Sequence, residues 1–365
     1  MQLFKKVFDL EHEQVIFCVD KRTNLKCIIA IHNTVLGPSL GGCRLLPYTS
    51  ESEAIEDVLR LSRGMSYKAA CAGLALGGGK AVIVADPKMK TECLLRTFGR
   101  FVESLKGRYI TAEDMNMTVD DMDTIRQESK YVVGVSENLG GSGNPSPLTA
   151  LGTYHGIKAA VRYRLKKNNL KGVKVSIQGV GSVGEHLCGL LIEDGAQVYA
   201  CDTSEDRLTY LKKKHNVKIV DCDKIYDLPV DVFSPCARGA IVNDETLKRL
   251  KCKIIAGAAN NQLEKESKHS RELMAKKILY APDYVISAGG LIHVYYNEIS
   301  RVGIQKSKKE VFNIGQTLFE IFKSSEKNGI TTREASDLYA ERRIKAMEDL
   351  KTIRTFEDPV KRYHS

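Results

Sequence analysis

The sequence contains no long apolar run and no closely spaced pair of cysteines. Its hydrophobic stretches all fall short of the roughly 18–20 residues that a bilayer-spanning helix needs. Its first residues, MQLFKKVFDLEHEQ, are charged where a signal peptide is apolar. The ten cysteines lie singly, without a CxxC pair, several of them in apolar stretches where a free thiol behaves as a small core side chain. We therefore expect a cytoplasmic protein with reduced thiols and no membrane partner.

Acidic residues are fewer than basic ones, since 45 aspartates and glutamates face 55 lysines and arginines and leave a net charge of +10. The basic residues are densest in residues 162–174, 212–218 and 248–253, where they alternate with helix-forming or turn residues. A nucleic-acid site would concentrate such charge on one surface, with aromatic residues among it for stacking. We therefore interpret these stretches as solvated faces and loops, and expect no nucleic-acid partner.

The length of 365 residues exceeds the usual size of one hydrophobic core, which predicts two domains. In the first third of the chain, residues 26–32 predict a strand. Ser50 then predicts the N-cap of a helix, with Glu53 completing a capping box. Apolar residues follow at helical spacing, and Gly64 is expected to end this helix.

The composition shifts at residues 140–147, which are rich in Gly and Pro. This run predicts a loop that serves as a hinge. A helix is expected over residues 148–165, and two amphipathic helices broken at Asn328 and Gly329 are expected at the end. Between them, helices alternate with strands predicted at residues 174–178, 197–202, 230–234, 253–257 and 279–280. This alternation indicates an α/β fold whose parallel sheet carries helices on both faces.

A glycine-rich turn follows the first of these strands and precedes a helix with an apolar face. Glycines at such a turn permit a tight bend, close approach of a pyrophosphate and close packing of the helix on the strand. Asp202 closes the next strand, where a carboxylate binds a ribose 2′-hydroxyl and repels a 2′-phosphate. NAD is therefore favoured over NADP, although Arg207 nearby weakens the exclusion slightly. The GxGxxG match consists of Gly179, Val180, Gly181, Ser182, Val183 and Gly184.

Three polar residues in the first third could supply the chemistry that a nucleotide-binding unit lacks: Lys68, Lys80 and Asp114. Oxidation of an amino acid needs a cation for the substrate carboxylate, a base that activates water, and a carboxyl group that moves protons. A lysine serves as the base if burial and a neighbouring cation lower its pKa. Lys80 follows three glycines and lies between apolar stretches, which favours this role. For Lys68 the local argument is weaker, and Asp114 could equally cap a helix.

Several motifs, in order, are similar to those of one enzyme family. LALGGGK at residues 74–80, followed by Val82, Asp86 and Pro87, matches the active-site signature of the glutamate/leucine/phenylalanine/valine dehydrogenases. GGCR, EDVLRLSRGMSYK, GRYITAED, GNPSP and APDYVISAGG extend the match from about residue 37 to residue 347. Within this family the sequence most resembles the leucine dehydrogenases.

The resemblance implies a role for each polar residue and a division of the chain. Lys80 would be the base that activates water, Asp114 its proton-handling partner, and Lys68 the cation for the substrate carboxylate. Residues 1–133 with 327–365 would form the substrate and oligomerisation domain, and residues 134–326 the NAD-binding domain, with a cleft between them. A homo-oligomer and no metal are expected. The remaining implied site residues are Gly41 and Gly42 for substrate, and Thr149 and Asn261 for cofactor.

The substrate class is inferred from the apolar residues that the resemblance implies for the pocket lining. Because no basic residue replaces the apolar ones, the γ-carboxylate of glutamate would lack a counter-charge. We therefore expect reversible oxidative deamination of leucine, valine or isoleucine to the 2-oxo acid and ammonia. Phenylalanine or another amino acid is the alternative, and an idle NAD-binding protein is a weaker one. The implied lining residues are Leu40, Met65, Ala112, Leu291 and Val294.

Four positions depart from the family pattern. Ser287 stands where asparagine is usual, and Asn260 replaces a leucine common in leucine dehydrogenases. His293 replaces a usual asparagine or similar residue, and Leu291 is bulkier than the usual valine. Ser287 is expected to shorten a hydrogen-bonding arm near the cofactor, and Leu291 to reshape the substrate pocket.

Overall fold

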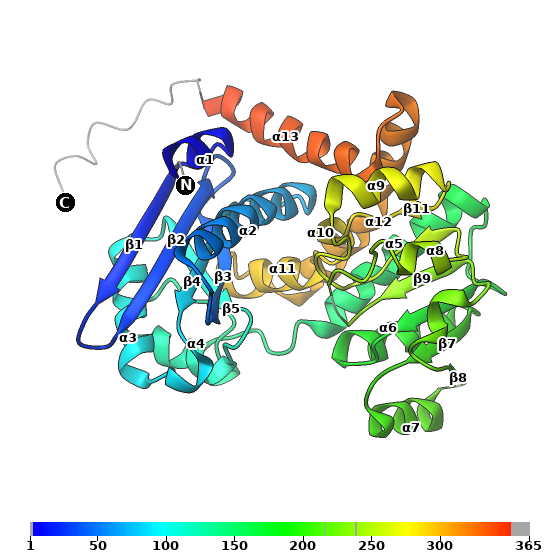
Figure 1. The fold of residues 1–365 in the computed structure, drawn as a ribbon, viewed down its shortest axis with the longest axis horizontal. Helices are drawn as coiled ribbons and strands as arrows, with labels where there is room; N and C mark the ends of the chain where they lie inside the picture. Colours follow the sequence, from blue (N-terminus) through cyan, green and yellow to red (C-terminus); the bar gives the residue numbers. More distant parts are fainter. Residues whose placement is uncertain (1–2, 216, 238, 352–365) are drawn as a thin grey trace.

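The computed structural model describes residues 3–351 except 216 and 238, so residues 352–365 of the predicted first domain lie outside the described residues. Two α/β units lie side by side, each built on its own sheet (Figure 1). This confirms the predicted fold class. The domain boundaries stay a prediction.

The N-terminal unit contains a mixed sheet in the strand order β1-β2-β4-β3-β5. β2 pairs antiparallel with β1 and β4, whereas β3 pairs parallel with β4 and β5. A buried cluster that includes Phe98, Tyr109 and Ile125 packs α3 and α4 against the sheet, and α2 packs against β2 and β4. The elements are β1 (Gln14–Asp20), β2 (Leu25–Asn33), β3 (Ser39–Leu46), β4 (Gly77–Val84), β5 (Tyr109–Glu113), α1 (Leu3–Asp9), α2 (Glu51–Cys71), α3 (Glu92–Ser104) and α4 (Val119–Arg126).

The long helix α2 shows where local signals succeed and fail. Ser50 caps it as predicted, with its side chain accepting from the Glu53 N–H at 3.2 Å. The second half of the predicted capping box is wrong, because the Glu53 carboxylate accepts from the Thr49 N–H at 2.8 Å instead. The predicted stop at Gly64 is also wrong: burial of the following turns continues the helix to Cys71. Gly73, with φ of 76°, follows that end in the left-handed conformation.

The second unit contains a parallel sheet in the order β11-β10-β9-β6-β7-β8, the doubly wound arrangement that binds dinucleotides where the strand order reverses. Helix α5 begins two residues before the predicted position, so the predicted loop ends at Pro145. The elements are β6 (Lys174–Gln178), β7 (Gln197–Cys201), β8 (Lys218–Ile219), β9 (Val232–Pro235), β10 (Ile254–Ile255), β11 (Leu279–Tyr280), α5 (Ser146–Leu165), α6 (Ser182–Glu193), α7 (Glu205–Lys214), α8 (Thr246–Arg249), α9 (Glu266–Ala275), α10 (Asp283–Ile286), α11 (Gly289–Val294) and α12 (Ile304–Asn328).

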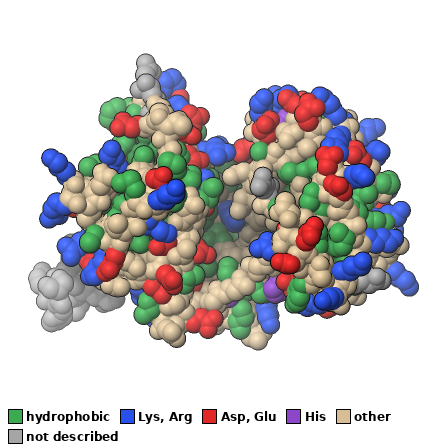
Figure 2. Space-filling view, turned by 60° about the horizontal axis from the view of Figure 1, so that its bottom comes forward, with side chains coloured by type: hydrophobic (Ala, Val, Ile, Leu, Met, Phe, Trp, Pro, Cys, Tyr) green, Lys and Arg blue, Asp and Glu red, His purple; other side chains and the backbone are tan. Residues whose placement is uncertain are grey.

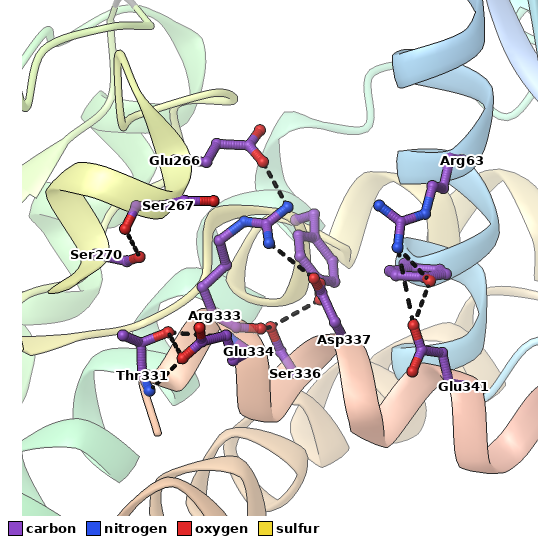
Figure 3. Close-up of polar contacts among 12 residues, drawn as sticks. Arg63, Glu266, Ser267, Ser270, Thr331, Arg333, Glu334, Ser336, Asp337 and Glu341 are labelled. Atoms are coloured by element: carbon purple, nitrogen blue, oxygen red, sulfur yellow. Dashed lines mark hydrogen bonds and ion pairs between the residues drawn. The ribbon is translucent and has the colours of Figure 1, made fainter. Parts of the chain in front are cut away.

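The last described helix, α13 (Thr332–Lys351), reaches from the second unit back to the first across the top of Figure 1. At one end, Arg333 binds Glu266 of α9 at 2.5 Å (Figure 3). Further along, Glu341 accepts from the Tyr67 hydroxyl of α2 at 2.6 Å. Helix α13 therefore ties the two units together on one side.

Figure 2 shows the surface hollowed between the two lobes. The connecting segment between α4 and α5 is held by Glu298, which accepts from the Gly134 N–H at 2.8 Å and the Ser142 N–H at 3.1 Å. Among the described residues, no helix combines the length and apolarity needed to cross a membrane.

Candidate active site

Three strands of the first sheet bring a lysine, an aspartate and an arginine together. Lys80 extends from the middle of β4, Asp114 directly follows β5, and Arg44 lies on β3 between them. One carboxylate oxygen of Asp114 accepts from both cations: from Lys80 Nζ, and from Arg44 Nε at 2.9 Å. The predicted pair of Lys80 and Asp114 therefore lies in direct contact.

Burial decides the charge balance of this cluster. Lys80 is 6% exposed, and burial lowers the pKa of its ammonium although Asp114 opposes the shift. Burial alone would raise the pKa of the Asp114 carboxyl, but the cations of Lys80 and Arg44 outweigh it and hold the pKa below its usual value. The cluster therefore pairs a lysine that loses its proton easily with a carboxylate that stays charged.

The glycines around Lys80 are needed for packing in the sheet. A side chain on Gly41 would lie 1.6 Å from the carbonyl oxygen of Gly79, and one on Gly78 would lie 2.1 Å from the backbone nitrogen of Ser66 in α2. A side chain on Gly42 would lie 2.6 Å from the carbonyl oxygen of Glu113. Glycine at these positions thus lets α2 and β3 approach β4, the strand that carries Lys80, and lets β5 approach β3.

Lys68, on the last turns of α2, faces the second unit. Its Nζ donates to the Ser287 hydroxyl at 3.1 Å, across the boundary between the two sheets. Burial lowers the pKa of Lys68 to about 8, against the influence of Asp283. A half-buried ammonium with spare donors at this place is suited to bind a carboxylate.

The five residues predicted to line the substrate pocket belong to one apolar cluster. Leu40 and Leu291 are buried in it, and Met65, Ala112 and Val294 are partly buried against it. They come from β3, α2, β5 and α11, so both units contribute to this cluster, and the substrate pocket stays a prediction.

The predicted nucleotide turn joins β6 to α6. Gly179 adopts a φ of 94°, and a side chain on Gly184 would lie 2.1 Å from the Gly179 carbonyl oxygen. Gly181 is the N-cap residue of α6, where the described residues provide no side-chain cap. Asp202, just beyond β7, accepts from the Val180 N–H at 2.8 Å. An uncapped helix N-terminus beside a carboxylate fits the pyrophosphate and ribose of a dinucleotide.

Two further predicted cofactor residues, Thr149 and Asn261, belong to the second unit. Thr149, on the first turns of α5, donates its hydroxyl to the Pro145 carbonyl at 3.0 Å. Asn261 follows β10 with a φ of 51°, a conformation that asparagine tolerates better than most residues.

Comparisons with known proteins match this arrangement along nearly the whole chain. Residues 12–131 match the family described as Glu/Leu/Phe/Val dehydrogenase, dimerisation domain, and residues 140–208 and 202–350 match Glutamate/Leucine/Phenylalanine/Valine dehydrogenase. The chain belongs to this family. It is therefore an amino-acid dehydrogenase, an oxidoreductase of the nicotinamide-dependent kind, as the motifs predicted.

Individual relatives differ in the amino acid that they are named for. An L-tryptophan dehydrogenase of Nostoc punctiforme is 52% identical over 94% of this chain and 96% of its own length. A leucine dehydrogenase of Thermoactinomyces intermedius is 48% identical over 98% of this chain and 96% of its own. The crystal structure of L-tryptophan dehydrogenase from Nostoc punctiforme superposes with a TM-score of 0.86 at 49% identity, covering 95% of this chain and 99% of that one.

Two of the positions that depart from the family pattern lie in contact. The Ser287 hydroxyl, which accepts from Lys68, donates to Asn260 Oδ1 at 3.4 Å. His293 instead faces the connecting segment, with Nε2 2.9 Å from the Ser142 carbonyl oxygen. His293 therefore helps to shape the connection between the units.

Sequence reasoning missed Arg44 and Glu298. Arg44 lies in the GGCR motif, where an arginine inside a buried strand was the available signal. Glu298 carries no local signal, because its backbone partners are more than 150 positions away in the sequence.

One cluster elsewhere has the composition of a metal site. The ligand atoms of Asp244, Glu264 and His269 lie within 4.8 Å of one another. However, Lys268 already binds Asp244, and His269 Nδ1 accepts from the Lys265 N–H at 3.0 Å while Nε2 faces Asp244 at 3.1 Å. With both ring nitrogens engaged, we assign no metal to this cluster.

Proposed function

We propose that this protein catalyses the reversible, NAD-dependent oxidative deamination of a branched-chain L-amino acid to the 2-oxo acid and ammonia. The observation that carries the proposal is the contact of the buried Lys80 with Asp114, supported by the ammonium of Lys68 and by the glycine-rich turn before α6. A carboxylate-binding cation, a base and a hydride-acceptor site are the three parts that this reaction needs.

Each polar side chain takes one task in the proposed reaction. Lys68 binds the substrate carboxylate and so fixes the position of Cα. Neutral Lys80 takes a proton from the water that adds to the iminium carbon, a step favoured by its lowered pKa. Asp114, held charged by Arg44, stabilises the lysine ammonium that results and relays protons to the departing amine.

The glycine turn fits a dinucleotide, and NAD bound there supplies the acceptor for the hydride from Cα. Gly181 and the first N–H groups of α6 would hold the pyrophosphate, and Asp202 the ribose 2′-hydroxyl. The Asp202 carboxylate disfavours a 2′-phosphate, which supports NAD over NADP.

The apolar cluster around Leu40 and Leu291 supports an aliphatic substrate side chain and disfavours a charged one. Tryptophan is the second candidate, favoured by the 52% identity to an L-tryptophan dehydrogenase. Contacts of one methylene change discrimination by only roughly 1–3 kcal/mol, so leucine, isoleucine and valine should not be sharply separated.

The test is NADH formation at alkaline pH on a panel of L-amino acids, with leucine, isoleucine, valine, phenylalanine, tryptophan and glutamate as members. Highest kcat/KM for the three branched-chain residues supports the proposal. A higher kcat/KM for tryptophan or phenylalanine would overturn the branched-chain substrate but leave the proposed deamination reaction in place. Absence of NADH with every member would overturn the reaction itself.

We also propose that the protein is a cytoplasmic homo-oligomer. Edge strand β1 presents Phe17 and Val19, which are 51% and 67% exposed, in a region that matches a dimerisation domain. The ten cysteines are free, which suits a reducing compartment. The solution mass from light scattering tests the assembly, and a monomer would overturn it.

A further inference from the structure

The contact between Lys68 and the second unit continues beyond its first partner. Lys68 Nζ donates to Ser287 Oγ at 3.1 Å, and Ser287 Oγ lies 3.4 Å from Asn260 Oδ1. Lys68 belongs to α2, Ser287 ends α10, and Asn260 lies in the loop after β10. Three elements from two units thus meet in one chain of hydrogen bonds.

The direction of these bonds follows from counting protons. A serine hydroxyl has one proton, and Asn260 Oδ1 can only accept, so the proton of Ser287 is directed to Asn260. A lone pair of the same oxygen is then left for the Lys68 ammonium. This ammonium has three N–H donors, and Ser287 takes one of them within the described residues. Two donors are left for a substrate carboxylate.

Ser287 is held firmly enough to fix a flexible lysine. It is 5% exposed, and its backbone N–H donates to the Asp283 carbonyl at 3.0 Å. The loop that carries Asn260 is fixed in turn, because the Asn261 carbonyl accepts from the Ala240 N–H at 2.7 Å. A long lysine side chain loses much rotamer freedom on binding, and a prepositioned one has less to lose.

The charged groups around Lys68 have opposing effects on its protonation state. Asp283 of α10 and Asp114 after β5 favour its charged form, whereas Lys80 of β4 opposes it, and burial lowers the pKa of Lys68 to about 8. A hydroxyl acceptor that contacts the ammonium favours the charged form, which alone binds a carboxylate well.

We propose that Ser287 and Asn260 act together as positioning residues, which hold the charged Lys68 from the second unit and aim it at the substrate carboxylate. The inference rests on the proposed function for the role of Lys68. It joins two departures from the family pattern into one: Asn260 accepts the proton of the Ser287 hydroxyl, and a lone pair of the same oxygen then faces the lysine.

The test compares Ser287→Ala with Ser287→Thr, which retains a hydroxyl. Ser287→Ala should raise KM for the amino acid about tenfold, the effect of one hydrogen bond to a charged group, with a smaller change in kcat. Its kcat/KM should fall at a lower alkaline pH than in the wild type, because Lys68 loses its proton earlier. Ser287→Thr should restore both values. Wild-type KM and pH profile in Ser287→Ala would overturn the proposal.

Asn260→Ala tests whether the two residues act as a pair. It should raise KM for the amino acid less than Ser287→Ala does. The double variant, Ser287→Ala with Asn260→Ala, should have the KM of Ser287→Ala alone, since the hydrogen bond between the two residues is already lost in that variant. Additive effects would overturn the pairing. Ser270→Ala is the matched control, because it removes a buried serine hydroxyl on α9 that donates to the Ser267 carbonyl (Figure 3).

A binding measurement separates this inference from the proposed function. Affinity of the NADH-loaded protein for a branched 2-oxo acid, measured by calorimetry, reports on the carboxylate contact without turnover. Weaker binding in Ser287→Ala than in Ser270→Ala supports the inference even if the amino-acid panel gives no NADH. Equal binding in both variants overturns the inference even if the wild type is an active dehydrogenase.

Discussion

The two units present their functional residues in different ways. In the N-terminal sheet, Lys80 is buried, Asp114 and Arg44 are half-buried, and Asp114 already binds both cations. In the second unit, the glycine turn leaves the N-terminus of α6 without a side-chain cap among the described residues. The N-terminal unit thus presents charged side chains that are already paired, whereas the second unit presents backbone N–H donors that a ligand can bind.

This difference follows from what each side would bind. A pyrophosphate is already charged, so the free backbone N–H groups of a helix N-terminus can bind it without a charged partner in the protein. A lysine that must lose a proton needs a low-dielectric place and fixed partners before substrate arrives. Substitutions in the charge cluster should therefore change rate and pH dependence, whereas those at the turn should change cofactor affinity.

Replacement of Lys80 should give the largest effect. Lys80→Ala removes the proposed base, and kcat should fall by roughly 10²–10⁴-fold. NAD affinity, measured by fluorescence titration, should stay unchanged because the glycine turn lies in the other unit. Undiminished turnover in this variant would show that the base has been assigned to the wrong residue.

Acid should destabilise the N-terminal unit through a buried histidine pair. The rings of His12 and His32 lie 4.9 Å apart, each in hydrogen-bond contact with a serine of α2, and burial lowers their pKa values to about 4 and about 3. The unfolded chain, with an ordinary histidine pKa of about 6.5, binds more protons below that pH. Stability is therefore lost as pH falls from about 6.5, by about 2.5 kcal/mol for His12 at pH 4.5.

Urea unfolding at pH 7 and pH 4.5 checks this effect in the wild type and in His12→Gln. The variant should lose less stability between the two pH values than the wild type does. His186→Gln, at an exposed position on α6, serves as the control and should behave as the wild type. An identical pH dependence in all three proteins contradicts the prediction.

The same contrast explains how much the sequence could reveal. The glycine turn was predictable because its strand, turn and helix are consecutive, and Asp202 contacts the turn that it follows by about 20 residues. The contact of Lys80 with Asp114 was expected only through the family resemblance, since β3, β4 and β5 converge in space and not along the chain. Arg44 was missed for that reason.

Two other differences have the same origin. Gly64 was expected to end α2, but packing of the next turns on the sheet outweighs the poor helix propensity of one glycine. Asn260 and Ser287 could be noted singly as unusual residues, yet their contact follows from a fold that brings the end of α10 to the loop after β10. Local conformation was readable from the sequence, whereas partners far apart in the chain were not.

Arg44 should tune the base without performing its chemistry. Its cation helps to lower the pKa of Lys80, so Arg44→Gln should raise that pKa and leave less neutral lysine at pH 7. A shift of one pKa unit would reduce kcat about tenfold at pH 7, with recovery at higher pH. The pH profile of kcat checks this, with the exposed Arg22→Gln as control. A uniform loss at every pH would point to a structural role instead.

Asp202 should give a smaller effect, confined to the cofactor. Its carboxylate already accepts from the Val180 and Ser204 N–H groups, so Asp202→Ser removes a ribose partner together with the charge that repels a 2′-phosphate. The ratio of kcat/KM for NAD to that for NADP should fall about fivefold, the range of one net hydrogen bond. Asp206→Asn, at an exposed position on α7, is the control. An unchanged ratio would show that the preference for NAD does not come from Asp202. Arg207 would then be the residue to replace, because its guanidinium lies 3.7 Å from where a Cβ on Gly181 would be.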